Sequence, residues 1–254
     1  MSSVFKRFSL ILYLIFAFIP FWLGMPLASN AFVLLAFAAS FAPSVAAFVV
    51  ISTVEGRTGL SAWLRRFFPK QVKARGYLLA VILPILVCSA VVWGSWVLGS
   101  QPNILGGPAL VLLVLVYFFA AGEELGWRGF MLTRLLERTP PLAAAIFMGI
   151  VHAVYHLSLW ISPGITVPAN LSLSFFVTSL GLGLLRTWLY LNSKGSVLVA
   201  TLFHGTFNAA GNVLFGGFLP VHLSWQLPIG FGLAAVVVLA YDHQIRQSQA
   251  VSSL

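Results

Sequence analysis

The stretch Gly-Glu-Glu-Leu-Gly-Trp-Arg-Gly-Phe, residues 122–130, places two adjacent carboxylates at the end of an unbroken apolar run, residues 108–121. Such a run predicts a membrane-spanning helix, in which an ionised carboxylate costs about 2.5 kcal/mol or more. Arg128 follows Glu124 by four residues on the same helical face, so the two can pair. Glu123 points about 100° away from that face and has no local counter-charge. Glu123 is therefore the carboxylate that the sequence leaves free for chemistry.

The composition predicts a membrane protein. The chain has 254 residues, of which 60% are hydrophobic and 7% charged, and its mean hydropathy is +1.00. Soluble domains carry roughly 25% charged residues. We therefore expect one integral membrane domain over residues 1–254. Its fold class would be an all-α polytopic membrane protein, with about eight transmembrane helices around a polar intramembrane cavity.

Apolar runs of membrane-spanning length occur at eight places in the chain. Each is close to the ~20 residues that cross a bilayer as a helix. The expected spans are residues 10–27, 32–53, 77–98, 109–130, 142–162, 170–191, 197–214 and 225–241.

The basic residues indicate the orientation of these spans. The net charge of +9 could suit nucleic acid, but the cations lie in short loops rather than in a dense stripe, so we expect membrane lipid and no nucleic acid as partner. With a cytoplasmic N-terminus, every basic loop falls on the cytoplasmic side, including the cations counted near the junction of spans six and seven, Arg186 and Lys194. The chain is thus predicted to have both termini in the cytoplasm, in a bacterial cytoplasmic membrane.

The first span has an alternative interpretation. Residues 1–31 combine a short basic start, an apolar core and a small-residue end, as a cleaved signal peptide does. The apolar core is long for such a peptide and a second span follows at once, so we expect a retained span. Cys88 is the single cysteine and lies in an apolar span, which excludes an intrachain disulfide and predicts a buried packing thiol.

One cytoplasmic segment, residues 60–68, places Trp and Phe beside Arg at helical spacing. This pattern suits a helix that lies in the membrane interface. A basic loop that only sets the topology is the alternative.

Histidines of the fifth and seventh spans can reach the carboxylates. His152 and His156 are four residues apart and share one helical face, as do His204 and Asn208. Spans four and five are joined by a tight turn at Thr139, so residues equidistant from that turn lie at similar depth. Glu123 is 16 residues before Thr139 and His156 is 17 after it, which favours His156 as the partner of Glu123, with His152 second.

The ordered motifs resemble those of the CPBP intramembrane proteases, which include CAAX prenyl proteases and the bacteriocin-processing or bacteriocin-immunity (Abi) proteins. Residues 123–128 resemble the E-E-x-x-x-R motif, and His204 with Asn208 resembles H-x-x-x-N. Residues 151–158 are similar to the histidine motif, with His156 at the family position and His152 replacing an aromatic residue. The resemblance covers residues 109–211, the expected catalytic core.

The resemblance implies peptide-bond hydrolysis within the membrane. Glu123 with His156 would activate a water, Arg128 would hold Glu124, and His204 with Asn208 would stabilise the oxyanion. A divalent metal such as zinc is an open possibility, with Glu123, His156 and His204 as ligands. No cofactor is otherwise expected.

We therefore predict an intramembrane endopeptidase that acts on a membrane-associated protein or peptide, lipidated or not. Two alternatives remain open at this point. One is a non-catalytic protein of the bacteriocin-immunity type, which would act by binding. The other is a proton-coupled transporter that uses the same Glu and His side chains.

Overall fold

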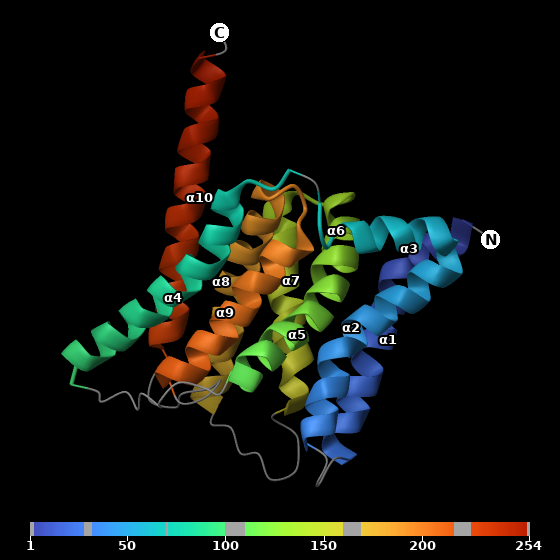
Figure 1. Ribbon diagram of the computed structural model, residues 1–254, viewed down its shortest axis with the longest axis horizontal. Coiled ribbons are helices and arrows are strands. Elements are labelled where there is room, and N and C mark those ends of the chain that lie inside the picture. The colour runs from blue at the N-terminus through green and yellow to red at the C-terminus, as the bar shows by residue number, and fades with distance from the viewer. Residues whose placement is uncertain are drawn as a thin grey trace.

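A computed structural model describes residues 3–27, 32–69, 71–99, 110–159, 169–215 and 225–252 (Figure 1). Within these ranges the chain forms helices and turns and no strand. The helices are α1 Ser3–Leu27, α2 Phe32–Val54, α3 Gly56–Arg65, α4 Ala74–Val97, α5 Leu110–Gly126, η1 Trp127–Leu132, α6 Thr133–Leu136, α7 Pro141–His156, η2 Leu157–Leu159, α8 Ala169–Asn192, α9 Val197–Phe215 and α10 Gln226–Ser252.

The expected membrane helices all occur at their predicted places. Among the described residues, the eight helices longer than 15 residues coincide with the eight apolar runs. Where side chains are described, three of them are long and apolar enough to cross a membrane, at Ala74–Val97, Leu173–Asn192 and Val197–Leu214, and four shorter apolar helices accompany them. The predicted class, a polytopic helical membrane protein, is confirmed.

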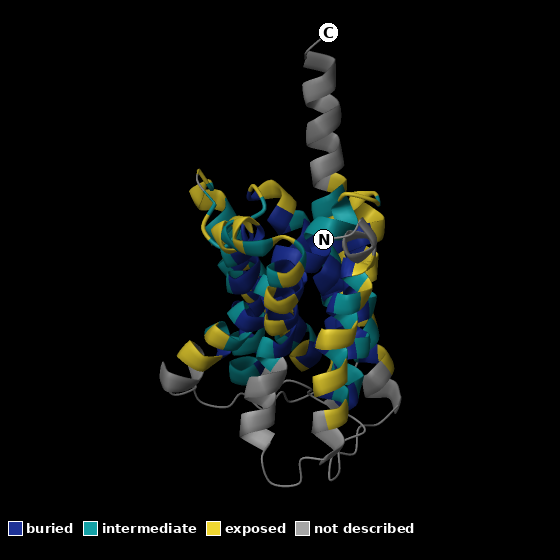
Figure 2. Ribbon diagram, turned by 90° about the vertical axis from the view of Figure 1, so that its right-hand side faces the viewer, coloured by how far each residue is buried: buried dark blue, intermediate teal, exposed yellow. Residues whose placement is uncertain are grey.

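The outside of the bundle is apolar, as a lipid-facing surface must be. Large hydrophobic side chains are exposed on several long helices, for example Trp93 and Trp96 on α4 and Val236 on α10, whereas buried residues fill the middle (Figure 2). A water-soluble monomer rarely exposes so much contiguous apolar surface. We therefore infer that these apolar helix faces contact lipid. Which end of the bundle faces the cytoplasm stays a prediction from the loop charges.

The described core has two hydrophobic clusters. The first joins α1, α2, α3, η1 and α7 and includes Tyr190 of α8 and Val197 of α9, whereas the second joins α4, α8, α9 and α10. Direct packing of α5 on α9 and of α7 on α8 joins the two halves. Cys88 lies inside the second cluster and is fully buried, which confirms its predicted packing role. The seam between the clusters is where the polar residues of α5, α7, α8 and α9 meet.

Glycines let α5 approach α2 very closely. A Cβ added at Gly126 would lie 2.3 Å from the Pro43 carbonyl carbon, and one at Gly122 would lie 2.8 Å from the Ser40 carbonyl oxygen. Ser44 Oγ also donates a hydrogen bond to the Gly122 carbonyl. Small residues spaced four apart are a common way for membrane helices to pack backbone against backbone. This contact fixes the residues between the glycines, Glu123 and Glu124, beside the first cluster.

The predicted fourth span is not one uniform α-helix. After Gly126 the chain continues as the π-helix η1, Trp127–Leu132, before α6 begins at Thr133. Single π-helical turns often occur at functional sites because they rotate the side chains around them. The turn after α6 ends at Pro140, and α7 begins with Pro141, a position where the missing N–H costs nothing.

The close packing at Gly126 yields a test of the fold. We expect Gly126→Ala to lower the stability by about 1–3 kcal/mol, because the new methyl group overlaps the α2 backbone. Thermal unfolding in detergent measures this change. Gly94→Ala is the matched control, since a Cβ there meets no atom within 4 Å. Equal effects of the two substitutions would contradict the backbone contact.

Candidate active site

The Glu124 carboxylate is the centre of a buried polar cluster. Its Oε1 accepts hydrogen bonds from Arg128 Nη1 at 3.1 Å, from Arg186 Nη1 at 2.9 Å and from His204 Nδ1 at 2.9 Å. Glu124 and Arg128 are fully buried, and Arg186 is 1% exposed. The predicted pairing of Glu124 with Arg128 is confirmed. The cluster joins α5, η1, α8 and α9 across the seam between the two halves.

Arg186 corrects the sequence interpretation. The prediction that counted it among the loop cations is wrong, because Arg186 lies inside α8 and its guanidinium group contacts Glu124. Two guanidinium groups therefore stand against two carboxylates, so the cluster is neutral when Glu123 and Glu124 are both ionised. The only signal in the sequence is that Arg186 comes five residues before the end of the apolar run 170–191, a position that a loop charge could also occupy.

Glu123 faces the α7 histidines across the same seam. Its Oε2 lies 3.9 Å from His152 Nδ1. Both atoms are buried and lack a hydrogen-bond partner among the described residues. A separation of 3.9 Å is too long for a direct hydrogen bond and suits two groups that hold one water molecule or ion between them.

The structure thus brings His152 to Glu123, whereas the residue count favoured His156. The count assumed equal rise per residue on both sides of the turn at Thr139. The wide turns of η1 advance less along the helix axis than α-helical turns, so Glu123 lies nearer that turn than the count implied. His152 then matches its depth.

His156 lies next to this pair and points its ring elsewhere. Its Nδ1–H donates to the His152 carbonyl at 2.9 Å, and its ring centroid is 4.4 Å from that of His152. The ring also contacts Phe21 of α1 and Phe175 of α8. Asn208 is half-buried one turn after His204. No hydrogen bond joins the Asn208 side chain to Glu123 or Glu124 in the described part of the chain.

The acid and two histidines are close enough to bind a metal ion. One ligand atom from each of Glu123, His152 and His204 lies within 4.8 Å of the other two, and all three residues are buried. The orphaned Glu123 and His152 atoms are free to coordinate. Because His204 uses Nδ1–H to donate to Glu124, its Nε2 also remains available, in the arrangement of a metal-binding histidine oriented by a carboxylate. Two imidazoles and one carboxylate are a zinc ligand set that leaves a position open. The residues fit such an ion, with His152 in the place where His156 was expected.

Comparison with known proteins identifies this part of the chain. Residues 105–210 match the family model described as type II CAAX prenyl endopeptidase, Rce1-like. Over these residues the chain is similar to the CAAX protease family. A CAAX prenyl protease 2 from Methanococcus maripaludis is 34% identical over 107 residues, which are 40% of this chain and 38% of that relative. The aligned part is therefore less than half of the relative's length.

The CAAX-family segment contains every residue of the buried cluster. Glu123, Glu124 and Arg128 come from its first part, His152 from its middle, and Arg186 and His204 from its end. The family resemblance inferred from the three motifs is thereby confirmed.

Arg186 provides a test of the cluster. We expect Arg186→Met to lower the stability by about 3–5 kcal/mol, because it leaves two buried carboxylates with one guanidinium group. Thermal unfolding in detergent measures the loss. In a double-mutant cycle, adding Glu124→Gln should cost much less in the Arg186→Met background than in the wild type, since the two side chains interact. Simple additivity of the two losses would show that the contact carries no coupling.

Proposed function

We propose that this protein is an intramembrane endopeptidase that hydrolyses a peptide bond of a membrane-associated protein or peptide. The observation that carries the proposal is the buried Glu123 facing His152 and His204 within the segment that matches the CAAX protease family. Carboxylate and imidazole groups buried together in a membrane bundle are costly, and such groups usually serve catalysis or transport. The family match favours catalysis over transport.

Glu123 is the proposed general base. Its free Oε2 and His152 Nδ1 are spaced to hold one water molecule. Glu123 would take a proton from that water while the water oxygen bonds to the scissile carbonyl carbon. When the carbon–nitrogen bond breaks, the same proton passes to the leaving amine. We assign to His152 the orientation of the water, and to His156 the support of the His152 backbone through its hydrogen bond.

We propose that Glu124 positions neighbouring side chains and takes no part in the reaction itself. Its Oε1 already accepts three hydrogen bonds, two of them from guanidinium groups. A carboxylate held in this way is a weak base and a rigid anchor. Its role would be to fix His204 and, through Arg128, the start of η1.

Stabilisation of the oxyanion is proposed for His204 and Asn208. His204 donates Nδ1–H to Glu124, so its Nε2 carries a proton for the oxyanion only in the imidazolium form. The Asn208 amide, one helical turn farther along α9, supplies a neutral donor. When His204 is neutral, the same Nε2 offers a lone pair instead.

As the alternative to a water held directly between Glu123 and His152, we propose that the same two residues and His204 hold a divalent metal ion, with zinc as the best match to the ligand types. When bound, such an ion supplies a Lewis acid that polarises a carbonyl group or activates a water. Glu124 then orients the His204 ring from behind, as carboxylates commonly do for metal-binding histidines.

The catalytic proposal is tested with purified protein in detergent and a panel of fluorogenic peptides. We expect Glu123→Gln to lower kcat/KM by about 10²- to 10⁴-fold, the usual contribution of a general base. His152→Ala should lower it more than His156→Ala, because His152 faces Glu123. Full turnover by Glu123→Gln would exclude the proposed mechanism, and a larger loss with His156→Ala would reverse the assignment of the histidines.

Metal binding is tested apart from catalysis by measuring the zinc content of dialysed protein. We expect about one zinc ion per chain in the wild type and a clear loss in His152→Ala, since three ligands are needed to complete the site. His156→Ala is the matched control, because the His156 ring lies beside the ligand group but outside it. Equal zinc content in wild type and His152→Ala would refute the site.

A further inference from the structure

A segment outside the three sequence motifs crosses the end of the bundle and contacts two of the helices that carry the site. We call residues 55–68 the strap. It contains α3, Gly56–Arg65, and the turn that follows. Trp63, which the sequence analysis placed in the membrane interface, is 5% exposed and packs in the first hydrophobic cluster. The predicted helix is present, but its tryptophan faces the protein rather than lipid.

The strap donates hydrogen bonds to the backbone around the π-helix. Trp63 Nε1 donates to the Leu125 carbonyl at 2.9 Å, and Arg66 Nη1 donates to the Gly129 carbonyl at 3.0 Å. Where a helix changes from α to π pairing and back, carbonyl groups are left short of backbone donors. The two carbonyls that the strap binds lie just before η1 and inside it.

Space at this contact is tight. A Cβ added at Gly129 would lie 3.0 Å from Trp63 Nε1, so the indole rests directly on the backbone of η1. At the far end of the same region, Arg134 of α6 pairs with Glu55 at the start of the strap. The strap therefore holds the chain from Leu125 to Arg134 at three points.

The same strap also caps the helix that carries His204. The backbone N–H of Val197 donates to the Arg66 carbonyl at 2.9 Å, and that of Leu198 donates to the Phe67 carbonyl at 3.3 Å. These N–H groups belong to the first turn of α9, where a helix has no internal acceptors. Arg66 thus joins η1 to α9, because its side chain binds η1 and its backbone carbonyl binds α9.

We propose that Trp63 and Arg66 are positioning residues of the active site. They hold η1 in its π-helical register, and they fix the height of α9 against α5, so that His204 and Glu123 stay within reach of the same ligand. The expected effect on turnover rests on the proposed function. The expected effect on local structure rests on the hydrogen bonds alone. Both effects can therefore be measured separately.

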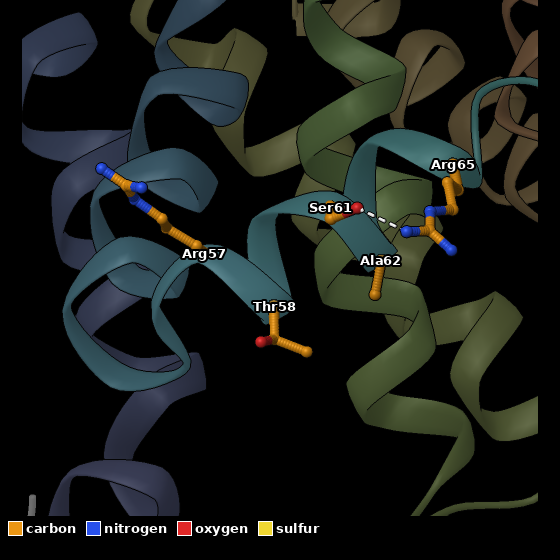
Figure 3. Close-up of a pocket in the computed structure, with 5 residues that line it drawn as sticks. All are labelled: Arg57, Thr58, Ser61, Ala62 and Arg65. Atoms are coloured by element: carbon orange, nitrogen blue, oxygen red, sulfur yellow. Dashed lines mark hydrogen bonds between the residues drawn. The ribbon is translucent and has the colours of Figure 1, made fainter.

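The outer face of α3 provides a matched control. It bears Arg57, Thr58, Ser61, Ala62 and Arg65, which line a shallow cavity of about 390 Å³ (Figure 3). Arg65 Nη2 donates to Ser61 Oγ at 2.9 Å on the same helix and so does not hold η1. Arg65→Gln and Arg66→Gln remove the same charge from neighbouring positions, but only Arg66→Gln removes a bond to the π-helix.

The kinetic test compares these variants in the peptide assay. We expect Trp63→Phe and Arg66→Gln to lower kcat by about 10- to 100-fold with little change in KM, as displaced catalytic groups do. Arg66→Lys, which keeps a cationic donor, should recover most of the loss. Arg65→Gln should match the wild type. Equal kcat values for Arg65→Gln and Arg66→Gln would overturn the proposal.

A structural test decides the proposal even if the wild type cleaves none of the peptides. Hydrogen–deuterium exchange in detergent is followed for peptides from η1 and from the start of α9. We expect exchange in the η1 peptides to rise roughly tenfold in Arg66→Gln, because the lost side-chain hydrogen bond to Gly129 shifts local opening by about that factor. The α9 peptides should change less, because the substitution keeps the Arg66 backbone carbonyl that accepts from Val197. No such rise in Arg65→Gln is expected. Unchanged exchange in Arg66→Gln refutes the positioning role, whereas an inactive wild type with raised exchange in Arg66→Gln refutes only the protease.

Discussion

Two carboxylates buried in an apolar bundle need two cations, and this requirement organises the structure. Glu123 and Glu124 lie on α5, Arg128 lies in the first turn of the π-helix, and Arg186 reaches in from α8. An unpaired charge at this depth would cost several kcal/mol. The helices must therefore pack so that both guanidinium groups meet Glu124. This packing brings α5 and α8 to one seam and leaves Glu123 directed toward the histidines of α7 and α9.

Most of the fold was predictable because lipid imposes a simple rule on the sequence. Every backbone polar group must be paired within the helix, so each crossing needs a long apolar run, and the runs at residues 32–53 and 197–214 match α2 and α9 almost to the residue. The π-helix escaped prediction because Trp127–Leu132 has no residue type that distinguishes it from an α-helix. Its geometry comes from contacts with Trp63 and Arg66, which are far away in the sequence.

Part of the buried polar cluster was predictable from the sequence, but its arrangement was not. The pairing of Glu124 with Arg128 followed from their spacing, since both lie on one helix face. The approach of His152 rather than His156 to Glu123 did not, because it depends on the shorter rise of η1. Arg186 was missed for a different reason. A cation near the end of an apolar run looks the same whether it points to a loop or to a buried partner, and only the packing of α8 on α7 distinguishes the two.

The salt bridge between Glu124 and Arg186 also bears on how the protein is made. During synthesis α5 enters the membrane long before α8 exists, so its acidic residues first lack one of their cations. Arg128 offsets one of the two carboxylates of this segment, and Arg186 of α8 supplies the second cation. The charge balance of the seam is therefore complete only after α8 has been translated.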